Sequence, residues 1–381
     1  MKKGVYQDIW DNAPTATLLY GQHASKAFAQ IEPHSVQLIA TSPPYSWPRN
    51  YRVPDVKMED GWEGQLGREP TPDLYAEHLV DVFDKARSIL RPDAVVFVNL
   101  ADNYVGGGGY VPTSPSNTKT ATKKRGFGGH GAGTVTGGIP TSCGIKAKSL
   151  ALAPFRFVTL MVDRGWICRS TIIWHKPSVT PQPDPTKLTV DHEYVFMFSM
   201  NRNYYFDGDP LRRVPSISAS YSYTPGESTE QEGPPPSQER RPLGRSVWHI
   251  STEHWSGTHK AVWPKGLVRP MIQAATSSKA CPQCRAPWRR VKGDQRVPSC
   301  PCPNNDGSAH CIVLDPFSGS GTTGEVALEE NADFIGIDLQ EDYFQEAMDR
   351  VQGLGYRGGQ EESTDPSTYP TIFTMFRNKS G

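Results

Sequence analysis

The chain has 381 residues with 40 basic and 40 acidic side chains, so its formal net charge is zero. This length allows one large or two moderate domains, and the balanced charge excludes a polycation that binds nucleic acid along its whole surface. No apolar run is long enough to span a membrane and no signal peptide is visible, so we expect a soluble, cytoplasmic protein.

The first informative stretch is 36–45. Its apolar residues Val36–Ala40 predict a buried strand, which Ser42-Pro-Pro-Tyr45 ends because two prolines remove two backbone donors and stiffen the chain. A rigid turn would hold the Ser42 hydroxyl and the Pro43 carbonyl as fixed acceptors beside an aromatic ring. That arrangement suits a flat ligand with an amino group; a proline-terminated strand with a packing tyrosine is the alternative.

A helix and a second strand follow. Apolar residues recur at helical spacing from Pro72 to Leu90, so we expect an amphipathic helix that Pro92 stops. The apolar run Ala94–Leu100 predicts a buried strand. Its polar end near Asn99 and Asp102 is either part of a ligand site or a cap.

The stretch Tyr104–Ser149 is rich in Gly, Ser and Thr and has no clear periodicity. A loop of this length is either functional or disordered. Its basic residues Lys123, Lys124 and Arg125 suit a flexible arm that closes on nucleic-acid phosphates, and a solvated insertion is the alternative. If the arm binds phosphates, neutralising the three side chains weakens binding and flattens its salt dependence.

The middle of the chain predicts a helix over 150–164 and strands over 169–174 and 193–199, which a proline-rich stretch separates. The polar segment 205–245 then carries two arginine pairs, and its residues alone are compatible with a plain linker. A further helix is expected over 264–276. The two arginine pairs are Arg212 with Arg213 and Arg240 with Arg241.

Four of the seven cysteines lie close together in the sequence, as Cys281-Pro-Gln-Cys284 and Cys300-Pro-Cys302. The first pair has the C-x₂-C spacing of structural zinc sites, and the second pair is tighter than usual. We expect one tetrahedral zinc site that pins this insertion against the following strand. Free thiols in a loop, or a degraded metal site, are the alternatives.

The most specific stretch begins at Ile312–Leu314, a predicted strand that ends in Asp315. Gly319 and Gly321 predict a tight turn, followed by a helix to about Asn331 that Thr322 and Thr323 would cap. A second strand, 334–337, ends in Asp338, a carboxylate that could bind ribose hydroxyls.

These residues also narrow the type of nucleotide that the glycine turn could bind. A phosphate-binding loop would require a lysine where Thr322 stands. Asp315 would repel a pyrophosphate, whereas it suits a ligand with a positive amino group, such as the methionine part of S-adenosylmethionine. After this unit we expect a helix over 341–351 and a partly disordered tail from Arg357, with an edge strand at Thr371–Thr374.

Two motifs together, Thr41-Ser-Pro-Pro-Tyr45 and Asp315-Pro-Phe-Ser-Gly-Ser-Gly-Thr-Thr323, resemble the β-class DNA amino-methyltransferases. The resemblance extends from about Gln37 to Val351. It implies transfer of a methyl group from S-adenosylmethionine to the exocyclic amine of a flipped-out base in double-stranded DNA. The form with Ser42 is similar to the cytosine-N4 enzymes, although some adenine-N6 enzymes also carry serine.

The resemblance also implies a fold: a Rossmann-like α/β methyltransferase with circularly permuted motif order, a mostly parallel doubly wound sheet and a small zinc-knuckle insertion. The expected parts are a catalytic half (1–204, with a mobile loop at 105–149), a target-recognition region (205–245), a cofactor-side segment (246–279), the zinc insertion (280–311), a cofactor-binding half (312–356) and a tail (357–381).

The resemblance assigns roles to individual residues. The catalytic motif is Ser42, Pro43, Pro44 and Tyr45. The expected cofactor-binding residues are Thr41, Trp263, Pro264, Asp315, Pro316, Phe317, Gly319, Ser320, Gly321, Thr322, Thr323 and Asp338. DNA contacts are expected from Lys123, Lys124, Arg125, Arg212, Arg213, Arg240 and Arg241, and zinc ligation from Cys281, Cys284, Cys300 and Cys302.

Several alternatives stay open at this point. A non-catalytic DNA-binding module or an RNA or small-amine methyltransferase would share parts of this pattern. No nuclease motif is evident, so we expect a stand-alone modifier in a bacterial, archaeal or phage-infected cell. No membrane partner is expected, and the choice between monomer and homodimer is open.

Overall fold

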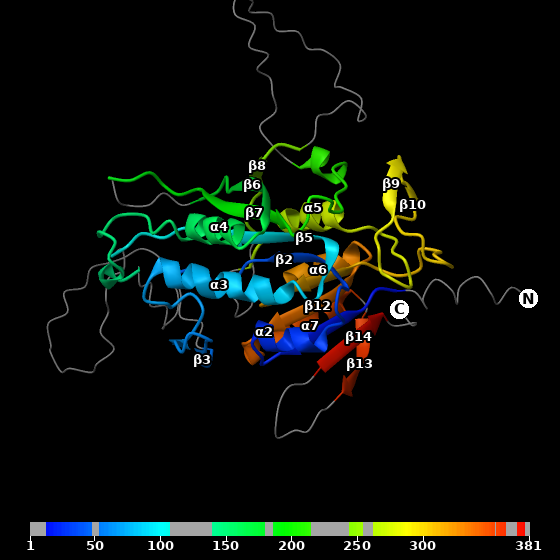
Figure 1. Ribbon diagram of the computed structural model, residues 1–381, viewed down its shortest axis with the longest axis horizontal. Coiled ribbons are helices and arrows are strands. Elements are labelled where there is room, and N and C mark those ends of the chain that lie inside the picture. Colours follow the sequence, from blue (N-terminus) through cyan, green and yellow to red (C-terminus); the bar gives the residue numbers. More distant parts are fainter. Residues whose placement is uncertain are drawn as a thin grey trace, which may run out of the picture. The chain divides into compact units, whose positions relative to one another are not determined.

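A ten-stranded sheet organises most of the chain in the computed structural model (Figure 1). Its strands are β1 (Ala16–Tyr20), β2 (Val36–Thr41), β5 (Leu90–Leu100), β6 (Ile167–His175), β7 (His192–Ser199), β8 (Val247–His249), β11 (Ile312–Asp315), β12 (Asp333–Asp338), β13 (Tyr356–Glu362) and β14 (Ile372–Arg377). Their spatial order is β13-β14-β1-β12-β11-β2-β5-β7-β6-β8. The five strands from β1 to β5 in this order are parallel, which confirms the predicted α/β fold.

The structure describes residues 13–47, 53–106, 139–179, 186–214, 244–253, 262–354, 356–362 and 372–377. The chain forms two compact units. The first combines Met1–Pro43, Val82–Leu100 and Met161–Gly381 and holds the large sheet, and the second combines Pro44–Asp81 and Ala101–Leu160.

Three helices pack on the central strands of the first unit. α5 (Lys265–Ala275) contacts β2 and β5, α6 (Thr322–Glu329) contacts β11 and β12, and α7 (Phe344–Gly353) contacts β1. α5 also packs against α6, and α6 against α7. Their apolar faces join the strands in one buried core that includes Leu38, Val313 and Phe334. Burial of this apolar surface holds the central strands together.

The remaining elements are short or connect the two units. α3 (Pro72–Ala86) and α4 (Ala153–Asp163) each begin in the second unit and end in the first. The other elements are α2 (Ala24–Ala27), four 3₁₀ turns (Phe28–Gln30, Thr141–Cys143, Pro210–Arg213 and Glu341–Tyr343), the pair β3 (Val56–Lys57) and β4 (Glu63–Gly64), and the hairpin of β9 (Arg289–Lys292) and β10 (Gln295–Val297).

Two expected elements differ from the structure. The helix predicted to reach Leu90 ends at Ala86, because Leu90 already pairs with Val36 in the sheet. Pro92 therefore lies inside β5, where the pairing of β2 with β5 shifts register.

The second difference concerns the tail. The edge strand expected at Thr371–Thr374 is β14, which lies between β1 and β13 and is not at the edge. Arg357, expected in a partly disordered tail, belongs to β13, which forms that edge of the sheet.

The chain leaves the two central strands in opposite directions. From β11 it passes through α6 to β12 on one side, and from β2 it passes through α3 to β5 on the other. The carboxyl ends of β2 and β11 therefore flank a topological switch point, the place where open α/β sheets bind their ligands. These two strands end in the two sequence motifs.

Candidate active site

The carboxylate of Asp315 joins the two motifs. Thr41, the last residue of β2, donates a hydrogen bond from Oγ1 to Asp315 Oδ1 at 2.6 Å. Thr323 Oγ1 donates to Asp315 Oδ2 at 2.5 Å, and the Phe317 backbone N–H donates to Oδ1 at 3.1 Å. Asp315 is 2% exposed, so the motif that contains Ser42 begins directly beside a buried acid.

Thr322 and Thr323 do not act as predicted. α6 has Gly321 at its N-cap and no side-chain cap, so the expected capping by these threonines is wrong. Thr323 instead lies in the first turn, where its hydroxyl reaches back to Asp315. A hydroxyl can make only one such donation, and here it stabilises the carboxylate instead of the helix end.

The glycines of the turn are required by its geometry. Gly319 and Gly321 have positive φ angles of 51° and 80°, a region that side chains disfavour. A Cβ atom on Gly324 would lie 2.5 Å from the ring of Phe334, so this glycine lets α6 pack closely on β12. The turn and its helix can approach a ligand as nucleotide-binding turns do.

A second acid, which is half-buried, supports the turn. Asp338, at the end of β12, accepts hydrogen bonds from the backbone N–H groups of Gly319 at 2.7 Å and Gln340 at 2.8 Å. The hydroxyl of Tyr20 donates to the Gly319 carbonyl at 2.7 Å. Tyr20 ends β1, a strand that the sequence analysis did not predict, although the run Ala16–Tyr20 is apolar enough to have indicated it.

Both acids have a raised pKa. Burial raises the pKa of Asp315 to about 6, and the hydrogen bonds from Thr323, Thr41 and Phe317 oppose this only in part. Burial also raises the pKa of Asp338 to about 6, and the charge of Asp315 adds to the shift. An ionised carboxylate in such surroundings favours a cationic ligand, because attraction to the cation offsets the cost of removing the carboxylate from water.

A family model described as DNA methylase (N6_N4_Mtase) matches residues 36–349. The chain belongs to this family. The match includes both motifs and the strands that carry them. The methyltransferase is therefore a DNA amino-methyltransferase, as the two motifs had predicted.

Curated relatives agree with this assignment. The methyltransferase is 29% identical over 339 residues to the type II methyltransferase M.Cfr9I of Citrobacter freundii, covering 89% of this chain and 88% of that protein. It is also 29% identical over 329 residues to M.SmaI of Serratia marcescens, with 86% and 88% covered.

A solved structure shares the fold. The cytosine-N4-specific PvuII DNA methyltransferase aligns with a TM-score of 0.52 at 15% identity, covering 89% of this chain and 87% of that one. In the part of the methyltransferase that the structure describes, no helix is long and apolar enough to cross a bilayer.

The second unit begins inside the catalytic motif, between Pro43 and Pro44. Tyr75 donates from its hydroxyl to the Pro44 carbonyl at 2.8 Å. Trp47 donates from its backbone N–H to Gly67 at 2.7 Å, and a Cβ on Gly67 would lie 2.6 Å from the Tyr45 carbonyl oxygen. The backbone around Tyr45 is thus held closely by the loop that contains Gly67.

That loop is held by a buried pair of side chains, Glu69 and His78, that the sequence analysis missed. Glu69 accepts a hydrogen bond from the Gly67 N–H at 2.8 Å, and its other oxygen lies 3.1 Å from Nδ1 of His78. The side chain of Glu69 is fully buried and that of His78 is 3% exposed. His78 falls on the apolar face of α3 with Tyr75 and Val82, and this spacing is the signal that could have found it.

The structure also places Asp102 and Trp263, two further residues that the sequence analysis singled out. Asp102 accepts from the backbone N–H groups of Leu152 and Ala153 at 2.9 and 3.3 Å, so it caps the start of α4. Trp263 is buried in the main core, 7% exposed.

Most of the residues expected to contact DNA lie outside the part of the chain that the structure describes. Arg212 pairs with Asp209 at 3.0 Å. Residues 123–125 and 240–241 lie outside the described part of the chain, as does the side chain of Arg213. The four cysteines expected to bind zinc are brought together.

Proposed function

We propose that this methyltransferase transfers a methyl group from S-adenosylmethionine to the N4 amine of cytosine in a flipped-out base of double-stranded DNA. The observation that carries the proposal is the hydrogen bond between Thr41 and Asp315, which brings the Ser42 motif and the acid-glycine turn to one switch point. The form with Ser42 favours cytosine-N4 over adenine-N6, and adenine-N6 is the second candidate. The reaction takes place in the cytoplasm within a restriction–modification setting, to which the type II names of its relatives point.

The residues at the switch point fit the methyl donor. Asp315 is a buried acid whose described partners are hydroxyl and N–H groups, so a cationic amino group would supply its missing countercharge. Gly319 and Gly321 carry no side chains in the turn that follows Asp315. Asp338 would accept from ribose hydroxyls, since each carboxylate oxygen can accept a further hydrogen bond. Trp263 and Pro264 would line the methionine end.

The bound donor supplies an activated methyl group on a cationic sulfur. The target base leaves the stack because its amine cannot reach that group inside the duplex. Tyr45 stacks on the base, and the Ser42 hydroxyl and Pro43 carbonyl accept hydrogen bonds from the amine, which draws its lone pair out of conjugation. The nitrogen–carbon bond forms as the carbon–sulfur bond breaks, and the extra proton passes to solvent. Positioning and electrostatics supply the rate, so no nucleophilic cysteine is needed.

We include a structural zinc ion, bound by Cys281, Cys284, Cys300 and Cys302, among the cofactors. DNA contacts are assigned to Lys123, Lys124, Arg125 and the arginines of 205–245.

The nature of the product tests the proposed substrate. Unmethylated DNA is incubated with the protein and the methyl donor, digested to nucleosides and analysed by mass spectrometry. We expect N4-methylcytosine. N6-methyladenine would replace the first candidate by the second, and modified RNA without modified DNA would overturn the proposal.

Replacing Ser42 with alanine tests the role of the motif. The Ser42→Ala variant should lose about 100-fold in the rate of methyl transfer, the typical effect of removing one positioned hydrogen-bonding group. Its affinity for the methyl donor, measured by calorimetry, should stay within about twofold of the parent protein. A variant that keeps its rate would exclude Ser42 from the reaction.

A further inference from the structure

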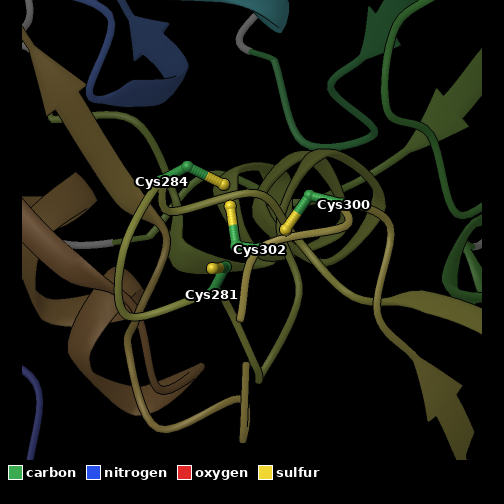
Figure 2. A group of neighbouring side chains, drawn as sticks. All are labelled: Cys281, Cys284, Cys300 and Cys302. Atoms are coloured by element: carbon green, nitrogen blue, oxygen red, sulfur yellow. The ribbon is translucent and has the colours of Figure 1, made fainter. Parts of the chain in front are cut away.

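Four cysteines from two separate segments converge before β11. The sulfur atoms of Cys281, Cys284, Cys300 and Cys302 all lie within 4.8 Å of one another, and Figure 2 shows them turned toward a common centre. None of the four forms a disulfide. In a tetrahedral site with zinc–sulfur bonds of about 2.3 Å the sulfur atoms are about 3.8 Å apart, so a small contraction closes the site.

Hydrogen-bond donors lie next to two of the sulfur atoms. The backbone N–H groups of Gln283 and Cys284 donate to Cys281 Sγ, and the N–H of Cys302 donates to Cys300 Sγ. Asn305 Nδ2 also donates to Cys300 Sγ at 3.2 Å. Hydrogen-bond donors that surround metal-bound sulfur fix the ligands and stabilise their negative charge. The folded chain therefore already supplies donors of this kind to Cys281 and Cys300.

The backbone of this segment is also shaped for ligation. Arg285, directly after the second cysteine, has a φ of 55°, and its N–H donates to the Cys281 carbonyl at 2.8 Å. The Cys281 N–H donates to the Ala286 carbonyl at 3.0 Å. This reverse turn brings both thiols of the pair to one side, although it holds a non-glycine residue at positive φ.

The cysteine segment is attached to the amino ends of three parallel strands. Arg91, near the start of β5, donates to the Cys284 carbonyl and also to Asp93 at 3.0 Å. Arg285 forms an ion pair with Asp333, the first residue of β12, at 3.0 Å. Ser277 donates from its backbone N–H to Cys311, directly before β11, at 3.4 Å.

We propose that one zinc ion, bound by these four thiolates, fastens the amino-terminal edge of the sheet and thereby supports the strand that carries the cofactor acid. The ion takes no part in the reaction. Asp315 lies at the other end of β11, about 10 Å from Ile312 at about 3.3 Å per residue. Four protein ligands leave no open position, so the site is structural.

The short length of β11 explains why a metal site before it would stabilise the sheet. β11 has only four residues, and the hairpin of β9 and β10 is the main regular structure in the long segment between α5 and β11. An ordered metal site limits the conformations of that segment and so holds β11 between β2 and β12. The hairpin of β9 and β10 is tied down as well, since Arg290 pairs with Asp207 at 2.7 Å.

Metal content is the direct test. Protein purified without added metal should contain about one equivalent of zinc by mass spectrometry. The double variant Cys300→Ser/Cys302→Ser should contain less than 0.1 equivalent, on the order expected when half the ligands are lost. Cys143→Ser, which changes a cysteine outside the cluster, is the matched control and should keep the metal. Parent protein with less than half an equivalent, or with iron in place of zinc, would overturn the proposal.

The fastening role has its own measurement. The double variant should unfold at least about 5 °C lower than the parent, whereas Cys143→Ser should match the parent. Below that temperature the variant should still methylate DNA at a rate within about threefold of the parent. An unchanged unfolding temperature would refute the fastening role.

If the double variant does not fold, the test is made on the parent protein. The zinc of the parent protein is exchanged for cobalt, and the intense visible absorption of tetrahedral thiolate coordination should appear. Its absence would exclude the four-thiolate site.

Discussion

Two buried carboxylates in this methyltransferase have opposite surroundings. Asp315 in the first unit is 2% exposed, and its described hydrogen-bond partners are two hydroxyls and one backbone N–H. Glu69 in the second unit is fully buried but lies 3.1 Å from Nδ1 of His78. Under the proposed function the first acid would meet a cationic ligand, whereas the second lies beside a histidine whose raised pKa favours the charged form.

The pKa values follow this difference. Burial raises the pKa of Asp315 to about 6. Burial lowers the pKa of His78, but its hydrogen bonds to Glu69 and Asp60 more than offset this and raise it above the ordinary value. The acid without an internal cation is therefore the one that we propose binds the methyl donor, whereas the acid beside a histidine supports the fold.

The largest effect is expected at the acid without a cation. Asp315→Asn should weaken binding of the methyl donor about 100-fold, or about 2.7 kcal/mol, because the amino group loses its countercharge. The free energy of unfolding should stay equal or rise, since a buried charge is removed. Calorimetric titration and urea unfolding measure the two quantities.

Asp349→Asn is the control for this change. Asp349 is an exposed acid on α7, so the variant has the same change in charge without the buried site. It should bind the donor as the parent does. If both variants bind the methyl donor equally well, Asp315 does not differ from Glu69 in the way proposed.

The reverse pattern is expected at the paired acid. His78→Gln should destabilise the protein by about 2 kcal/mol, because the buried Glu69 loses its cationic partner. The methyl donor should bind within about twofold of the parent, while the transfer rate falls, since Glu69 holds the Gly67 loop against the Tyr45 backbone. Urea unfolding and single-turnover kinetics provide the measurements.

Asp60→Asn distinguishes the ion pair from general damage to α3. Asp60 lies 3.2 Å from Nε2 of His78, but its side chain is 45% exposed. Its replacement should leave stability almost unchanged. A loss as large as that of His78→Gln would show that the buried partner is not the important one.

The smallest effects are those of pH. Affinity for the methyl donor should be constant above about pH 7 and fall about tenfold per unit below about pH 6, where a proton neutralises Asp315. The raised pKa of Asp315 also means that its contribution to the stability of the ligand-free protein is fully present below 3.8 and is lost as the pH rises through about 6.

The pH dependence of His78 lies higher. Its raised pKa contributes stability that is fully present below 6.5 and is lost as the pH rises through the raised value. Unfolding measured from pH 5 to 9 should therefore show a loss that His78→Gln removes. Equal pH dependence in both proteins would contradict the ionic pairing of His78.

Local residue patterns were sufficient to predict where the strands carrying the two motifs end, where the glycine turn lies and which cysteines form a candidate metal site. Ser42-Pro-Pro-Tyr45 ends a strand because proline restricts the backbone wherever it stands, and Gly319 and Gly321 allow a turn for an equally local reason. The two motifs also indicated the family. These properties depend on neighbours in the chain and need no knowledge of the fold.

The partners of these residues depended on the three-dimensional arrangement. The bond from Thr41 to Asp315 joins residues 274 positions apart, and it exists because β2 and β11 pair as neighbours in the sheet. The use of the Thr323 hydroxyl, the pairing of Glu69 with His78 and the position of β14 inside the sheet arise in the same way. Hydrogen bonds and burial between distant segments decide them, and no short stretch of sequence contains that information.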